Sequence, residues 1–166
     1  MKHSPIAVAN TFVSRYGSVE EITHMKLQKL VFFAHGWFLA LKGSPLVNEQ
    51  PQVWRYGPVF RSLYSRLTGR RNNRIESPVS AGPFNEFEKI PDTETDSIKL
   101  IDWIWDKYGH LTAEMLSNLT HEDGTPWHTM ASKYNFSVPP YLDMENELVQ
   151  EYFSKLAEKE HIKVTS

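Results

Sequence analysis

The sequence predicts a mainly α fold: a single compact helical domain of about seven helices, with a small β-hairpin or extended element after the second helix. Apolar residues recur every three or four positions in seven stretches, the spacing that places them on one side of a helix. Residues typical of helix ends, such as Ser and Thr before a stretch and Gly after it, bound most of them. The chain has 166 residues, 40% hydrophobic and 13% aromatic, so we expect one domain spanning residues 1–166 with a genuine core.

The first helix is expected from Pro5 to Tyr16. Ser4 can cap its start, and proline suits the first helical position because its φ is already helical and its missing N–H is not needed there. Gly17 marks its end.

The second helix contains the stretch MKLQKLVFFAHGW, residues 25–37. Its apolar residues cover most sides of a helix, which predicts a central, almost completely buried helix between Thr23 and Gly43. Lysines, a glutamine and a histidine interrupt it before the ~18 apolar residues that a membrane span needs. We expect His35 to be a buried histidine with satisfied hydrogen bonds, and Gly36 to mark the close approach of another element.

The character of the sequence changes after the second helix. Residues 52–56 alternate as a strand does and predict a small hairpin or extended turn. A third helix is expected from Gly57-Pro58 to Gly69, because Val59, Leu63 and Leu67 recur one turn apart.

A long connection follows, at about residues 70–95, without helical spacing. It is punctuated by Pro78, Gly82, Pro83 and Pro91, and we expect it to be the most variable and mobile part of the chain. Four further helices are then predicted. The first is capped by Asp96 and stops at Gly109; the others run from Thr112 through Leu119, from Thr125-Pro126 through Tyr134, and, after Pro139-Pro140, from Met144 through Leu156.

The composition excludes several classes of function. The chain has no cysteine, which removes disulfides, thiolate metal sites and cysteine nucleophiles. Its N-terminus lacks the uninterrupted apolar run of a signal peptide, so we expect a cytoplasmic protein with no membrane partner. A net charge of -2 provides no overall attraction for nucleic acid, which makes nucleic acid an unlikely partner unless a local patch binds it.

Charge is distributed unevenly along the chain. Residues 55–74 contain six arginines and no acid, a net of +6, whereas residues 75–106 contain eight acids and two lysines, a net of -6. The two segments could neutralise each other through exposed ion pairs. Alternatively, the arginines could bind an acidic partner surface, because the planar guanidinium suits carboxylates and phosphates. A third interpretation is a nucleic-acid-associated phage protein that uses the basic segment 55–74.

The sequence shows no assembled catalytic motif. It contains no G-x-S-x-G, no Walker loop, no G-x-G-x-x-G and no H-E-x-x-H. The densest group of possible metal ligands is His121, Asp123 and His128. They lie in the loop 121–128, within the stretch THEDGTPWH at residues 120–128. Its spacing matches no known ligand pattern, so a metal-dependent hydrolase is kept only as an alternative. We expect no enzyme activity, no catalytic residue, no metal and no cofactor.

Three segments of the chain carry a resemblance to a known family. They are ITHMKLQKLVFFAHGWFLALKGSPLV, VWRYGPVFRSLY and LSNLTHEDGTPW. In this order they resemble the Panacea domain, the SocA-like family of phage- and prophage-associated bacterial proteins. The family motif T-x-x-K-L-Q-K-L-x-x-F/Y-A-x-G-W/H corresponds to residues 23–37, W-x-Y-G-P-V to 54–59, and L-S-x-x-T-H with P-W to 116–121 and 126–127. The resemblance covers roughly residues 5–153, and the connection 70–91 has no matching motif.

The resemblance implies an antitoxin of a toxin-antitoxin system. Such a protein would neutralise a cognate protein toxin, encoded by an adjacent gene, by direct protein-protein binding, and in one mode it would act as an adaptor that delivers the toxin to a protease. Neither the toxin nor the oligomeric state can be predicted from the sequence.

An inhibitor of this kind needs a surface with a few strong anchor residues, which are most often Trp, Tyr and Arg. The candidate partner-binding residues are Trp54, Tyr56, Gly57, Pro58, Arg61 and Arg66, with His121 and Trp127 as a second group. Structural roles stay open for some of them: Trp127 would instead lock its loop against the core, and Gly57-Pro58 would only shape a turn.

Overall fold

The computed structural model describes residues 2–80 and 87–163 and confirms the mainly α fold. In these residues there are seven α-helices and one two-stranded sheet. They are α1 (Pro5–Tyr16), α2 (His24–Lys42), β1 (Gln52–Trp54), β2 (Gly57–Val59), α3 (Arg61–Leu67), a 3-10 turn η1 (Thr68–Arg70), α4 (Thr95–Tyr108), α5 (Ala113–His121), α6 (Pro126–Ser132) and α7 (Asn146–Lys159). Among the described helices, none combines the length and the apolar character that crossing a bilayer requires.

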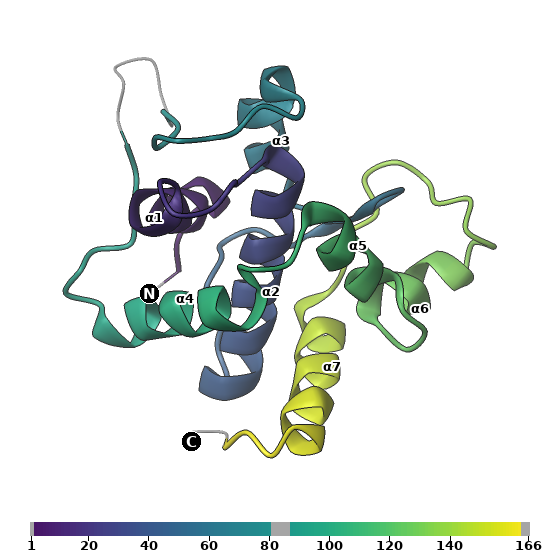
Figure 1. The fold of residues 1–166 in the computed structure, drawn as a ribbon. Coiled ribbons are helices and arrows are strands. Elements are labelled where there is room, and N and C mark those ends of the chain that lie inside the picture. Colours follow the sequence, from purple (N-terminus) through teal and green to yellow (C-terminus); the bar gives the residue numbers. More distant parts are fainter. Residues whose placement is uncertain (1, 81–86, 164–166) are drawn as a thin grey trace.

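Helix α2 runs through the middle of the molecule, with α1 and α4 on one side and α5 and α7 on the other (Figure 1). It contacts α1, α3, α4, α5, α7 and β2, and almost all of its side chains are buried. Thr23 caps its start by accepting a hydrogen bond from the Lys26 N–H, and Gly43 ends it in the left-handed conformation. The prediction of a central, all-round buried helix is therefore confirmed.

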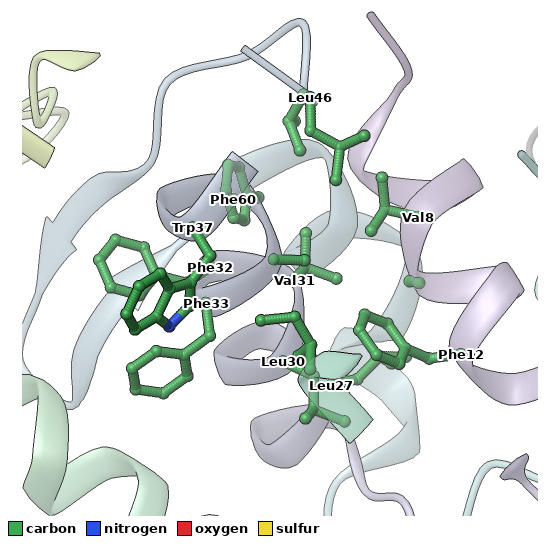
Figure 2. Close-up of a cluster of buried hydrophobic side chains, with 14 of the residues drawn as sticks. Val8, Phe12, Leu27, Leu30, Val31, Phe32, Phe33, Trp37, Leu46 and Phe60 are labelled. Atoms are coloured by element: carbon green, nitrogen blue, oxygen red, sulfur yellow. The ribbon is translucent and has the colours of Figure 1, made fainter. Parts of the chain in front are cut away.

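The core is packed on both sides of α2 (Figure 2). On one side Leu27 and Val31 lie near Val8 and Phe12 of α1. On the other side aromatic rings stack and cross: Phe33 with Tyr108 at 4.2 Å, Phe32 with Phe153 at 5.8 Å, and Trp37 with Phe153 at 5.4 Å between ring centroids. These contacts join α4 and α7 to the central helix.

Both special residues of α2 have the roles that the sequence predicts. His35 is fully buried; its Nε2 lies 2.9 Å from Asn146 Oδ1, and its Nδ1 accepts a hydrogen bond from the Val47 N–H. Burial lowers the pKa of His35 to about 4, so the ring is neutral. Gly36 faces α7, where a Cβ would lie only 2.1 Å from a ring carbon of Phe153.

Some predicted helix boundaries are wrong. Gly57-Pro58 does not begin a helix; residues 57–59 form β2, and α3 begins at Arg61. The reason is a tertiary contact, because the Gln28 side chain accepts a hydrogen bond from the Phe60 N–H at 2.9 Å and donates one to the Phe60 carbonyl at 3.2 Å. This pair holds the backbone extended. Likewise, Met144 precedes α7, and its N–H donates to Pro51 O in an extended segment. Tyr134 lies beyond the end of α6 at Ser132. The cap of α4 is Glu94, two residues before the expected cap Asp96, and the helix begins at Thr95.

The connection 70–95 is anchored to the core in its described parts, which the sequence did not predict. Residues 81–86, which include the predicted breakers Gly82 and Pro83, lie outside the described residues. On either side, Ile75, Val79 and Ile90 are buried. The Asn10 side chain of α1 bonds the Val79 N–H at 2.6 Å and the Val79 and Glu88 carbonyls at 2.8 and 3.0 Å.

The contact at Gly36 yields a stability prediction. Gly36→Ala should destabilise the protein by roughly 1–3 kcal/mol, because the added methyl forces Phe153 or the α2–α7 packing to move. Thermal unfolding followed by circular dichroism measures this loss. Gly69→Ala is the matched control, since a Cβ there meets nothing within 4 Å, and adding Phe153→Leu to Gly36→Ala should restore part of the loss. A melting temperature of Gly36→Ala equal to that of the wild type would contradict the packing described here.

Candidate partner-binding site

The hairpin packs against α2, α5 and α6 and presents its turn to solvent. Strands β1 and β2 are antiparallel, with Trp54 opposite Gly57, and the two-residue turn between them, Arg55-Tyr56, is exposed. Gly57 has φ +114°, and a Cβ there would lie 2.8 Å from Thr120 Oγ1 and 2.9 Å from Lys29 Cε. A glycine is thus required for the turn to sit against α2 and α5.

Three side chains from α5 and α6 reach three successive backbone carbonyls of this turn. The contacts are Trp127 Nε1 to Trp54 O at 2.6 Å, His121 Nε2 to Arg55 O at 3.2 Å, and Ser117 Oγ to Tyr56 O at 2.9 Å. Buried or partly buried carbonyls need such partners, because losing them costs about 1–3 kcal/mol each. The turn is therefore held in one conformation by side chains that are distant in sequence.

Helix α2 holds the other strand. The Lys29 ammonium donates to Pro58 O at 3.2 Å, and Gln28 forms its two bonds to Phe60. Lys29 is only 1% exposed, and burial lowers its pKa to about 8. We call the five residues that hold the hairpin, Gln28, Lys29, Ser117, His121 and Trp127, the hairpin clamp.

The loop between α5 and α6 is arranged to support the clamp. Thr125 caps α6 by accepting a hydrogen bond from the His128 N–H, and its hydroxyl donates to Thr120 O at 2.7 Å. The His121 ring packs 4.0 Å from the Trp127 ring, and its Nδ1 lies 2.6 Å from Ser117 O. Pro126 occupies the first turn of α6. The two predicted residues of this loop, His121 and Trp127, are thus in contact with each other and with the hairpin.

Beside the hairpin lies an open groove of about 780 Å³, which we call the apolar groove. Apolar side chains make up most of its lining, and no Asp or Glu contributes to it within the described residues. Its floor includes Val53 and Trp54, and its rim includes Arg55 and Arg61. The full lining is Val53, Trp54, Arg55, Arg61, Tyr64, Ser65, Trp127, Phe136, Val138, Pro139, Pro140 and Tyr141.

The outer wall of the apolar groove is the loop that follows α6. In Figure 1 this loop extends away from the helices before it returns toward the strands. It is tied to the edge of β1 by the Val53 N–H donating to Leu142 O at 2.9 Å. Phe136 and Tyr141 have φ of +63° and +62°, a conformation unfavourable for side chains with a Cβ. Both rings are nevertheless largely exposed, 55% and 64%.

The structure places the predicted residues in three different settings. Trp54, Arg61 and Trp127 line the apolar groove, and the Arg61 guanidinium lies 4.1 Å from the Tyr141 ring centre. Tyr56 is 59% exposed on the turn. The remaining predicted residues do not line the groove: Gly57 and Pro58 are buried, His121 lies behind the turn, and Arg66 is exposed on α3.

Sequence reasoning missed the loop that forms the outer wall. Tyr64, Phe136 and the segment 138–141 line the groove, but none of them is among the residues predicted to bind a partner. Their signal was two large aromatic residues, Phe136 and Tyr141, next to a Pro-Pro pair in a stretch without helical spacing. The left-handed backbone that exposes these rings cannot be read from the sequence.

The acidic segment 75–106 pairs with several different parts of the molecule. Its ion pairs include Asp102 with Arg15 at 2.8 Å and Asp96 with Lys42 at 3.8 Å, and Glu94 Oε2 lies 2.7 Å from His3 Nε2. At the junction of the two segments, Arg74 pairs with Glu76 at 3.7 Å. Mutual neutralisation of the two segments therefore has support at their junction, while these other acids stabilise the contacts of α4 and the N-terminal region.

The geometry does not support the metal site that was kept as an alternative. His128 Nδ1 lies 3.3 Å from Asp123 Oδ1, but His121 is directed toward the carbonyls of Ser117 and Arg55. Within residues 2–80 and 87–163, no group of three or more His, Asp and Glu side chains is placed to hold a metal ion. The 121–128 loop is organised as a helix cap and part of the hairpin clamp.

Comparisons with known proteins point to one family. The family model described as antitoxin SocA-like, Panacea domain, matches residues 27–128, more than half of the chain. A curated relative, Antitoxin SocA from Caulobacter vibrioides (strain NA1000 / CB15N), is 30% identical over 132 residues, which cover 76% of this chain and 69% of the relative. No solved structure matches the chain significantly.

Lys29 yields a prediction about pH. Because the pKa of Lys29 is about 8 in the folded protein and 10.5 ordinarily, the unfolded chain binds an extra proton between these values. Stability should therefore rise with pH across this window, by on the order of 3 kcal/mol from Lys29. Lys29→Met should lack this contribution, which urea unfolding at pH 7.5, 8.5 and 9.5 would measure against wild type. Lys155→Met, at an exposed lysine, is the control and should keep the rise; an unchanged slope in Lys29→Met would contradict the buried ammonium.

Proposed function

The chain belongs to the SocA-like Panacea antitoxin family, and from this premise we propose that it neutralises a cognate protein toxin by direct binding. The toxin would be encoded by an adjacent gene, and the encounter would take place in the cytoplasm, which suits a chain without cysteine. The surface that we assign to the toxin consists of the apolar groove and the exposed turn Arg55-Tyr56.

The observation that carries the proposal is the apolar groove itself. Soluble proteins rarely expose large apolar surfaces unless a partner covers them. Here Trp54 and Trp127 form part of the lining, Tyr64 and Tyr141 flank it, and Arg61 lies at its rim. Trp, Tyr and Arg are the residues that most often dominate binding energy at protein interfaces. The combination fits a protein partner better than a small polar substrate.

The hairpin clamp gives this surface a second property that an inhibitor needs. Binding is weakened when loops must be ordered at the moment of association. The turn carbonyls of residues 54–56 already have side-chain partners, so the turn is ordered before the toxin arrives. A preformed surface of this kind supports tight binding without a large interface.

Two modes of neutralisation are compatible with this surface. In the first the antitoxin masks the toxin, and in the second it delivers the toxin to a protease as an adaptor. They differ in the fate of the toxin: masking leaves its half-life in cells unchanged, while delivery shortens it. A pulse-chase measurement of toxin half-life with and without the antitoxin separates the two.

The proposal as a whole is tested by expressing the protein encoded next to this gene. That protein should arrest growth when expressed alone and be harmless when co-expressed with this chain, and the two should co-purify as a complex of defined stoichiometry. If neither neighbouring reading frame is toxic, or if the two proteins do not bind, the proposed function is wrong.

Two substitutions on the surface should weaken the complex without affecting the fold. Arg61→Glu and Tyr56→Ala should each lower toxin affinity more than tenfold in calorimetric titration, because both side chains are exposed at the groove or turn. The melting temperature of each variant should match that of wild type. Arg70→Glu and Tyr134→Ala are the matched controls, since both residues are exposed and outside the groove lining, and they should retain wild-type affinity.

A further inference from the structure

A second, smaller cavity lies next to the apolar groove. It has a volume of about 380 Å³, and its lining includes Lys29, Arg55, Tyr56 and Arg71; we call it the basic pocket. Trp54, Arg55 and Tyr64 line both cavities, and the Trp54 and Tyr64 rings pack 4.7 Å apart. The two cavities are therefore neighbours that share one wall, and a single extended ligand can contact both.

The charge of the basic pocket has one sign. Lys29, Arg55 and Arg71 contribute three cations, and in the described part of the chain no Asp or Glu lines the pocket. The pKa of His24, which also lines the pocket, is lowered to about 4 by burial and by the positive charge of Lys29. A carboxylate entering the pocket would meet only favourable charges.

Arg71 is held in a conformation that arginine rarely adopts. Its φ and ψ are +52° and -122°, values that are typical of glycine in a tight turn. Its side chain is exposed at the pocket, and no ion pair of Arg71 occurs among the described residues. A strained residue with an unused charge is a feature of binding sites, where strain persists because the position serves the ligand.

The same feature occurs on the far side of the apolar groove. Phe136 and Tyr141 also have positive φ and exposed side chains. Both cavities are thus bordered by non-glycine residues whose backbone is unfavourable, and in each case the side chain that is presented matches its cavity: aromatic at the apolar groove, cationic at the basic pocket. The pair of cavities is complementary to a ligand with one apolar and one acidic group.

We propose that the apolar groove and the basic pocket together bind one segment of the toxin, in which a large apolar side chain fills the groove and a nearby Asp or Glu enters the pocket beside Arg71 and Arg55. This proposal rests on the proposed function and specifies the chemistry that the toxin must offer. A polypeptide is favoured over nucleic acid because the larger cavity is lined mainly by apolar side chains, Val138 and Pro139 among them, which give no partner to phosphates.

The test uses the purified antitoxin and the toxin encoded beside it. Arg71→Gly removes the cation and relieves the backbone strain, so it should keep or raise the melting temperature while lowering toxin affinity at least tenfold. Tyr141→Asn should act in the same way at the groove, since asparagine accepts positive φ. Arg70→Glu is the control for charge on the same segment. Falling affinity with rising stability is an outcome that a purely structural role cannot produce.

Charge exchange then identifies the acidic residue of the toxin. Each Asp and Glu of the toxin is changed to Lys and tested against wild-type antitoxin and against Arg71→Glu. One reversal should weaken binding to the wild type at least tenfold and be rescued at least fivefold by Arg71→Glu, the signature of a direct pair in a double-mutant cycle. Absence of any rescued pair would overturn the proposed pairing.

The outcomes separate this inference from the proposed function. If the toxin is neutralised and binds Arg71→Gly and Tyr141→Asn as tightly as wild type, it docks elsewhere; the inference is then wrong and the antitoxin function stands. If wild-type antitoxin does not bind the toxin at all, both proposals fail. Binding of a 20-nucleotide DNA with steep salt dependence that Arg71→Gly abolishes, without toxin binding, would likewise overturn the inference in favour of a nucleic-acid partner.

Discussion

The structure depends on satisfying the backbone of a very short hairpin. Two strands of three residues are not stable on their own, and the turn residues Arg55 and Tyr56 lie outside the strand pairing. The hairpin clamp supplies those partners from α2, α5 and α6. Because the contributing side chains are up to 73 residues from the carbonyls they bind, the conformation of the hairpin depends on the assembled helices. Local structure here is a product of tertiary packing.

This dependence explains why the three motifs that resemble the Panacea family occur together. The K-L-Q-K run places Gln28 and Lys29 against the hairpin, the W-x-Y-G-P-V run is the hairpin, and the L-S-x-x-T-H and P-W runs provide Ser117, His121 and Trp127. Two of the buried polar residues of α2 follow from the same arrangement, since Gln28 and Lys29 bond the backbone of Phe60 and Pro58. Most of the family's motif residues in this chain are thus structural residues that shape a surface.

Some features of this fold follow from local sequence patterns, and others are imposed by residues that are distant in the sequence. The central helix, its caps at Thr23 and Gly43, the buried His35 and the close approach at Gly36 follow from local patterns, because apolar spacing and helix-end residues are local signals. The extended conformation of residues 57–59 does not follow, because Gln28 imposes it from 32 residues away. Nor does the anchoring of Val79 and Glu88 by Asn10, or the left-handed backbone at Phe136. Of the candidate site, Trp54, Arg61 and Trp127 are predicted from their residue types and line the apolar groove, while the loop opposite them is recognised only in three dimensions.

The loop that forms the outer wall of the groove is attached to the rest of the protein mainly through its main chain. The Phe136 N–H donates to Ala131 O, the Val53 N–H to Leu142 O, and the Met144 N–H to Pro51 O, so the positions of the loop's ends do not depend on which side chains it carries. The exposed side chains between these points, such as Phe136 and Tyr141, can be exchanged with little effect on the core, whereas Val138 and Leu142 pack against it. A surface built in this way can change what it recognises through a few wall residues, in the manner of an antibody loop on a constant framework.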